Sequence, residues 1–137
     1  MKEYTTSFHE LQQDRACADR YKHLREALKD RGYNAPITLS EILKHNGVLD
    51  VCWMLFDHKG YRPTPWNPKQ EEARAFIFEI IERGRKHNAS GKKFIEVFRE
   101  NSFVGWITMR VACKSPYFRR LISRAVKAQA KAAKETV

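Results

Sequence analysis

The sequence predicts an all-α fold: a single-domain, compact helical bundle of about six or seven helices that spans residues 1–137 and ends in a basic C-terminal helix. Three observations lead to this prediction. Several segments begin with a capping residue and continue with apolar residues at the helical period of 3.6. Hydrophobic residues make up 42% of the chain, which is enough for one core at this length. Near the C-terminus, basic residues recur at helical spacing.

The first two predicted helices begin with the spacing of a capping box. Ser7 is followed three residues later by glutamate and predicts the start of a helix of about 23 residues that ends at Gly32. Thr38 has the same spacing and predicts a shorter helix that ends at Gly47. Residues 48–56 are nearly all apolar and fit a buried helix or a buried strand. Their helical neighbours favour a helix.

The next predicted helix covers residues 68–87, because Asn67 suits the N-cap and Pro68 the first helical position. Its apolar residues at helical spacing predict a core face made of Ala73, Phe76, Ile77, Ile80 and Ile81. Phe78 falls off this face and is expected to be exposed or to serve a second packing surface. We further expect Trp53 to be buried together with Phe76, Ile77 and Ile80.

Residues 94–98 fit a short helix, and residues 103–113 are harder to assign. Their valine, isoleucine, threonine and aromatic content has strand character, but a lone strand would lack a partner, so we expect a helix. Ser115 then suits an N-cap, and Pro116 predicts the first position of the basic C-terminal helix.

Five basic residues follow one another at steps of four, three, four and three in this last helix and form what we call the basic stripe: Arg120, Arg124, Lys127, Lys131 and Lys134. At about 100° per residue they project from one arc, while apolar residues gather on the opposite side. That apolar side comprises Phe118, Leu121, Ile122, Ala125, Val126 and Ala132. One face is therefore expected to pack, and the other to meet negative charge.

The charge excess of the chain is concentrated in the same segment. Residues 114–137 contain seven basic residues and one acidic residue, so they carry +6 of the net charge of +10. Such a local excess is typical of proteins that bind nucleic acid or another polyanion. The alternative is that these residues merely solvate a terminal helix.

The composition predicts a cytoplasmic protein. The first ten residues are polar, with no apolar run after a basic start, and no segment approaches about 18 uninterrupted apolar residues, so neither a secretory signal nor a membrane span is expected. Cys17, Cys52 and Cys113 are odd in number and far apart in the sequence, and we expect reduced core thiols.

The common catalytic and phosphate-binding motifs are absent from the sequence, so we expect no enzyme, cofactor or metal. Two weaker alternatives remain. His45, Asp50, Asp57 and His58 lie close together in the sequence and offer metal ligands or an acid–base pair, although histidines at helix ends more often interact with the terminal carbonyls. Glu96 and Glu100 offer paired carboxylates, but a solvated helix face is the simpler interpretation.

A loop over residues 59–67 is the second candidate binding site, because its prolines and glycine exclude regular structure. Tyr61, Arg62 and Trp66 offer stacking and cationic contacts to bases or to a protein surface. Alternatively, Tyr61 and Trp66 fold back onto the core.

Residues 37–55 contain the pattern ITL-x-EIL-x-x-NG-x-x-D-x-x-W-x-L. The matching residues are Ile37, Thr38, Leu39, Glu41, Ile42, Leu43, Asn46, Gly47, Asp50, Trp53 and Leu55. This pattern resembles a segment of small helical proteins of phages and mobile elements, some of them labelled immunity proteins. The resemblance implies such an origin and an all-helical class, and it implies no chemistry.

The leading functional hypothesis is a non-catalytic binding protein, of the phage or mobile-element accessory type, that presents its basic stripe to nucleic acid or a nucleoprotein complex. The alternative is an inhibitor of the anti-defence type that binds an acidic host protein directly. It would use the same stripe, or the loop residues together with Phe78.

Overall fold

The computed structural model describes residues 1–13, 16–55, 70–85 and 110–135, and all structural statements below concern these residues. Helices account for 74% of them, which confirms the predicted all-α class. The helices are α1 (Phe8–Gln13), α2 (Ala18–Ala27), α3 (Leu39–Asn46), α4 (Val48–Leu55), α5 (Glu71–Arg85) and α8 (Pro116–Glu135). Residues 110–112 are also helical, which agrees with the helix expected over residues 103–113. Residues 103–109, the predicted 59–67 loop and the predicted 94–98 helix lie outside the described residues.

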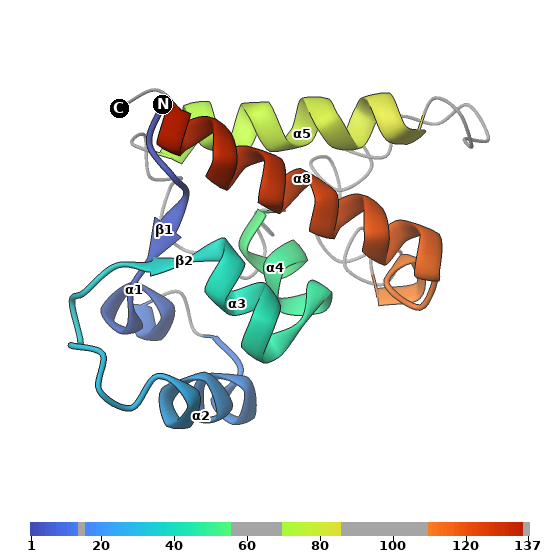
Figure 1. Ribbon diagram of the computed structural model, residues 1–137. Coiled ribbons are helices and arrows are strands. Elements are labelled where there is room, and N and C mark those ends of the chain that lie inside the picture. The colour runs from blue at the N-terminus through green and yellow to red at the C-terminus, as the bar shows by residue number, and fades with distance from the viewer. Residues whose placement is uncertain (14–15, 56–69, 86–109, 136–137) are drawn as a thin grey trace.

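The helices form two groups that meet along α8 (Figure 1). α5 and α8 run side by side in opposite directions and make the most extensive helix–helix contact among the described elements. α3 and α4 pack beneath α8, and α2 packs on the far side of α3. α8 therefore covers the rest of the bundle with one face and leaves the other face in solvent.

A small sheet that the sequence did not predict ties the N-terminus to the bundle. β1 (Thr5–Thr6) pairs antiparallel with β2 (Ile37–Thr38), in the register Thr5 to Thr38 and Thr6 to Ile37. Two buried glutamines bond the same N-terminal segment from other elements. Gln70 Oε1 accepts from Thr5 N at 2.6 Å, and Gln129 Oε1 accepts from Tyr4 N at 3.3 Å. These bonds satisfy backbone N–H donors of the N-terminal segment that have no partner in the short sheet.

The predicted continuous helix from Ser7 to Gly32 is wrong. Its start is as expected, because Ser7 Oγ accepts from Glu10 N at 3.1 Å. The chain then leaves α1 after Gln13 and begins α2 at Ala18, so that the two helices pack against each other. The Phe8 and Tyr21 rings meet edge to face at 5.5 Å across this contact. Burial of the two apolar faces against each other favours the break, and no glycine or proline marks it in the sequence.

α3 and α4 follow the prediction closely. Thr38 Oγ1 accepts from Glu41 N at 3.1 Å, and Thr38 N donates to Glu41 Oε1 at 3.2 Å, which completes the capping box. Arg31 donates to both carboxylate oxygens of Glu41 from the preceding turn. Gly47 ends α3 with φ of 87°, a conformation that favours glycine. Residues 48–55 then form the expected helix, and Phe56 lies outside the described residues.

α5 buries part of the predicted face together with two residues outside it. Ala73, Ile77 and Ile81 are buried as expected, but Phe76 and Ile80 are only half-buried. Arg74 and Phe78 take their places in the interior, at 5% and 4% exposure. Apolar residues occupy most of the circumference of this helix, so helical periodicity alone allows more than one buried face. Trp53 of α4 is also half-buried, packed against the core rather than within it.

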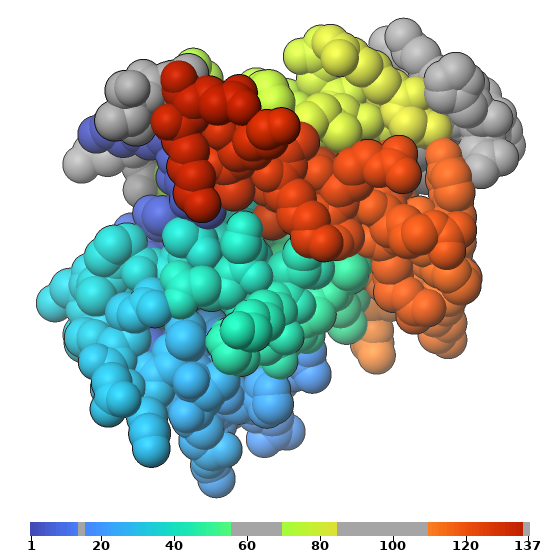
Figure 2. Space-filling model, in the orientation of Figure 1, coloured from blue at the N-terminus to red at the C-terminus, as the bar shows by residue number. Residues whose placement is uncertain are grey.

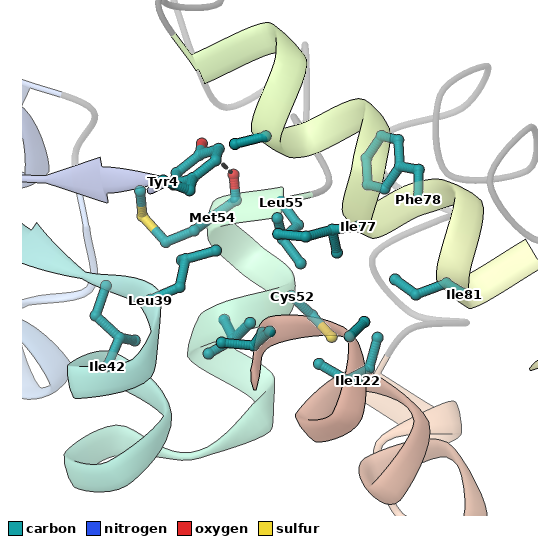
Figure 3. Packing of buried hydrophobic residues seen from close by; sticks show 14 of the residues in the cluster. Tyr4, Leu39, Ile42, Cys52, Met54, Leu55, Ile77, Phe78, Ile81 and Ile122 are labelled. Atoms are coloured by element: carbon teal, nitrogen blue, oxygen red, sulfur yellow. Dashed lines mark hydrogen bonds between the residues drawn. The ribbon is translucent and has the colours of Figure 1, made fainter. Parts of the chain in front are cut away.

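The core lies where α4, α5 and α8 converge (Figure 3). Leu55, Ile77, Ile81 and Ile122 are completely buried there and come from three helices that are far apart in the sequence. The Tyr4 hydroxyl donates to Met54 O at 3.2 Å at the edge of this cluster. The N-terminal segment is thus part of the core boundary and not a free tail.

The cysteines differ from one another in burial. Cys52 is buried and Cys113 is half-buried, as expected of core thiols, but Cys17 is exposed at the start of α2. All three are free thiols. Among the described residues, no helix combines the length and the apolar character that a membrane span needs.

Candidate nucleic-acid interface

The basic stripe lies on the solvent face of α8. Ser115 positions this helix, because its Oγ accepts from Phe118 N at 3.4 Å and Pro116 follows as the first helical residue. Ile122 and Ala125 are completely buried, which sets the rotation of α8 about its axis. The five stripe residues consequently point to solvent, and each is exposed: Arg120, Arg124, Lys127, Lys131 and Lys134.

Within the described part of the chain, none of the five stripe residues forms an ion pair. The single acidic residue of α8, Glu135, follows the stripe at the end of the helix. The positive charge of this face is therefore not neutralised by the described residues. The basic side chains repel one another, and a bound anion reduces this repulsion.

A groove of ≈ 830 Å³ runs between the stripe and the helices beneath it, and we call it the basic groove. α8 crosses the front of the molecule above α3 and α4, where this groove lies (Figure 2). Its lining carries five basic side chains and no acidic one. The lining residues are Leu43, Val48, Pro116, Arg119, Arg120, Ser123, Arg124, Lys127, Ala128 and Lys131.

Four of the five stripe residues line the basic groove, and Lys134 lies outside it on the last turn of α8. Sequence reasoning missed Arg119, which is exposed and adds a fifth cation to the lining. It also missed the apolar floor formed by Leu43 of α3 and Val48 of α4. The packing of α3 and α4 against α8 brings these two residues to the stripe, and no spacing within α8 indicates it.

Of the other predicted site residues, the described part of the chain includes Phe78. Tyr61, Arg62 and Trp66 lie outside the described residues. Phe78 was expected either to be exposed to a partner or to serve a second packing surface. It is only 4% exposed, so the first alternative is wrong and its burial agrees with the second. The Arg74 guanidinium lies over its ring, 4.6 Å from the centroid, and Arg74 Nε donates to Leu55 O at 2.8 Å. Phe78 thus stabilises the contact between α5 and α4.

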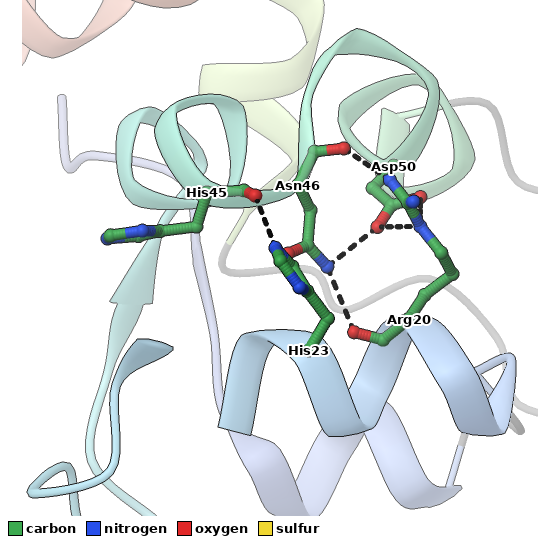
Figure 4. A network of polar contacts seen from close by, with 5 residues as sticks. All are labelled: Arg20, His23, His45, Asn46 and Asp50. Atoms are coloured by element: carbon green, nitrogen blue, oxygen red, sulfur yellow. Dashed lines mark hydrogen bonds and ion pairs between the residues drawn. The ribbon is translucent and has the colours of Figure 1, made fainter. Parts of the chain in front are cut away.

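Part of the histidine and aspartate cluster considered as a metal site is described, and its residues His45 and Asp50 belong to a polar network (Figure 4). Asp50 accepts from Arg20 Nε at 3.1 Å and from Asn46 Nδ2 at 2.8 Å. Asn46 Nδ2 also donates to Arg20 O, and the His23 ring contacts His45 O. The network joins α2 to the α3–α4 corner. Asp57 and His58 lie outside the described residues, as do Glu96 and Glu100.

Among the described residues, no group of three His, Cys, Asp or Glu side chains comes close enough to hold a metal ion. A cavity of ≈ 450 Å³ adjoins the network between α1, α2 and α4. It is lined mainly by apolar side chains, including Leu24, Leu49 and Trp53, with Arg20 and Asp50 at its polar end. The Asp50 carboxylate is already bonded by Arg20 and Asn46, so it is not a free base facing this cavity.

Comparisons of this chain with protein-family models, with curated proteins and with solved structures find no match.

Proposed function

We propose that this protein is a non-catalytic nucleic-acid-binding protein that uses the basic groove of α8 to bind a phosphate backbone, alone or in a nucleoprotein complex. The observation that carries the proposal is the run of exposed cations along one groove with no acidic residue in its lining. Phosphates neutralised by Lys and Arg release counterions, which supplies most of the affinity of such an interface.

The dimensions of the stripe support a backbone contact. Arg120 and Lys134 are fourteen residues apart on one helix, so the stripe extends over about 21 Å at about 1.5 Å per residue. One strand of a DNA duplex presents about six phosphates over that length. Five stripe cations and Arg119 are therefore comparable in number with the phosphates that they would meet.

The proposed contact is independent of nucleotide sequence. Apart from its cations, the groove lining offers one side-chain hydrogen-bonding group, the Ser123 hydroxyl. Reading base edges requires several donors and acceptors placed to match them, whereas phosphate contacts only position the protein. We therefore expect similar affinity for unrelated sequences and a strong dependence on salt.

A second candidate function is suggested by the apolar floor of the basic groove. Leu43, Val48 and Ala128 lie among the cations, and such a surface suits an acidic protein segment with apolar anchors. In this role the protein would inhibit a host protein directly, as an anti-defence factor does.

The resemblance of residues 37–55 to phage and mobile-element proteins supports an accessory role for both candidate functions. The free thiols are compatible with a cytoplasmic location.

The test replaces Arg124, Lys127 and Lys131 by glutamine and measures binding to labelled duplex DNA and single-stranded RNA at several salt concentrations. The triple variant should bind all sequences more weakly. On duplex DNA the magnitude of the salt slope should fall by up to about 0.9 for each lost contact. All three residues are exposed, so thermal stability should barely change.

A matched control replaces three exposed lysines outside the groove, Lys22, Lys29 and Lys44, by glutamine. This variant loses the same charge and should keep most of the affinity and slope of the wild type. Equal weakening by both variants would show that net charge alone attracts the ligand. Absence of binding by the wild type at low salt would reject the nucleic-acid function, and a pull-down from nuclease-treated host lysate would then test the second candidate.

A further inference from the structure

Two cysteines that are 61 positions apart in the sequence meet at the base of α8. Cys52 belongs to α4, and Cys113 lies in the turn that precedes α8. Their Sγ atoms are 3.9 Å apart, and both thiols are free. In Figure 3 the Cys52 sulfur points toward α8, beside Ile122. The third cysteine, Cys17, is exposed and lines the apolar cavity next to α2.

The two thiols have different surroundings. Cys52 is completely buried, and burial raises the pKa of its thiol well above the ordinary value. Cys113 is only half-buried, and its hydrogen bond with the Cys52 thiol lowers the pKa of Cys113, with a further contribution from the positive charge of Arg119. Cys113 is therefore the more accessible thiol and the one that forms a thiolate more readily.

The backbone around Cys113 allows the sulfur atoms to approach. A disulfide requires an S–S distance of about 2.05 Å, so the pair must close by nearly 2 Å. Cys113 lies in a turn between the helical residues 110–112 and α8, where Lys114 N donates to Val111 O and Ser115 N to Ala112 O. Side-chain rotation and a small shift of this turn can supply the movement, while Cys52 stays within the core.

We propose that Cys52 and Cys113 form a redox-active pair, which a hydroperoxide oxidises to a reversible disulfide between α4 and the start of α8. The disulfide would hold the first turn of α8, which carries Arg119 and Arg120 of the basic groove, against α4. The proposal concerns the two thiols alone and stands whether or not the groove binds nucleic acid.

The reaction has two steps. The Cys113 thiolate attacks one oxygen of the hydroperoxide; an S–O bond forms, the O–O bond breaks, and the leaving oxygen takes up a proton. Cys52 Sγ then attacks the sulfur of the resulting sulfenic acid; the S–S bond forms, the S–O bond breaks, and hydroxide leaves as water with the Cys52 proton. The two thiols lose two electrons in total, and the hydroperoxide is reduced to an alcohol, or to water when the oxidant is hydrogen peroxide.

The experiment uses the Cys17→Ser variant, which removes the exposed thiol and the intermolecular disulfides that Cys17 would form. Serine is a favourable N-cap residue at this position, so the variant should fold. Treatment with hydrogen peroxide should remove the mass of two hydrogen atoms from the monomer, and dithiothreitol should restore it. Proteolysis without reduction should release one linked pair of peptides, containing Cys52 and Cys113, and the oxidised monomer should melt at a higher temperature.

Single replacements separate the roles of the two thiols. In the Cys17→Ser background, Cys52→Ala should leave Cys113 to be trapped as a sulfenic acid by dimedone, whereas Cys113→Ala should leave Cys52 largely unreacted. If Cys52→Ala does not fold, rapid alkylation of Cys113 before Cys52 in the intact Cys17→Ser protein supplies the same comparison. A monomer in which both sulfurs gain oxygen without cross-linking, or in which peroxide leaves the mass unchanged, would overturn the proposal.

Discussion

Replacing Gln129 tests the most unexpected contact in the structure, a buried glutamine within the basic C-terminal helix. Gln129 is 1% exposed and lies among the apolar residues on the inner face of α8. Its Oε1 accepts from Tyr4 N at 3.3 Å, and its Nε2 donates to Lys2 O at 3.0 Å. One side chain therefore binds both a donor and an acceptor of the N-terminal segment.

The expected loss follows from these two bonds. Gln129→Met keeps the length of the side chain but removes both hydrogen bonds, each of which contributes about 1 kcal/mol to stability. We expect a loss of about 2 kcal/mol for Gln129→Met. Gln129→Ala also opens a cavity beneath the segment, so its loss should rise to about 3–4 kcal/mol. Either loss is a large fraction of the total stability of a domain of this size, which is typically 5–15 kcal/mol.

Urea unfolding followed by far-ultraviolet circular dichroism measures these differences, and amide hydrogen exchange at Tyr4 reports the local bond. Gln13→Ala, at an exposed position of α1, is the matched control and should change the free energy of unfolding by less than about 0.5 kcal/mol. If Gln129→Ala behaves like this control, or if Tyr4 exchanges equally fast in Gln129→Met and wild type, the N-terminal segment is not held by Gln129 and our reasoning is refuted.

Three further predictions concern the core, helix packing and acid stability. Ile77→Ala should cost about 2–5 kcal/mol in urea unfolding because Ile77 is fully buried. Ile80→Ala should cost less because Ile80 is half-buried, and an equal cost would favour the predicted face of α5, which includes both residues. Gly84→Ala places a Cβ against Leu121 Cδ1 and should lower the melting temperature. In a Leu121→Ala background the same change should be neutral or stabilising. Equal effects in both backgrounds would contradict this contact. The pKa of Glu41 is lowered mainly by its hydrogen bond with Arg31, so the pair stabilises the fold at neutral pH. This contribution is lost as the pH falls below about 4.5, which is the ordinary pKa of glutamate. Glu41→Gln should accordingly weaken the fold more at neutral pH than in acid, and an equal loss at both pH values in thermal melts would exclude the ion pair as the cause.

The sequence predicts those features that depend on neighbours a few residues away. The Thr38 capping box, the Gly47 stop and the Ser115–Pro116 start of α8 each involve contacts within one helical turn, so their spacing is sufficient to recognise them. The basic stripe is predictable for the same reason, because the period of 3.6 places residues three and four apart on one face. Its function is not predicted by this pattern, since a stripe of cations is compatible with more than one polyanion.

The tertiary structure decides which helix faces meet, because burial depends on what each face packs against and not on its own period. The break between α1 and α2 places the apolar faces of the two helices in contact, and no residue in the sequence marks it. Likewise, α5 is apolar around most of its circumference, and the packed structure buries Phe78 while it leaves Phe76 half-buried. The approach of Cys113 to Cys52 and the placement of Leu43 beneath the stripe have the same origin. Both contacts join residues that are far apart in the sequence, and the distances between such residues are set only when the helices pack.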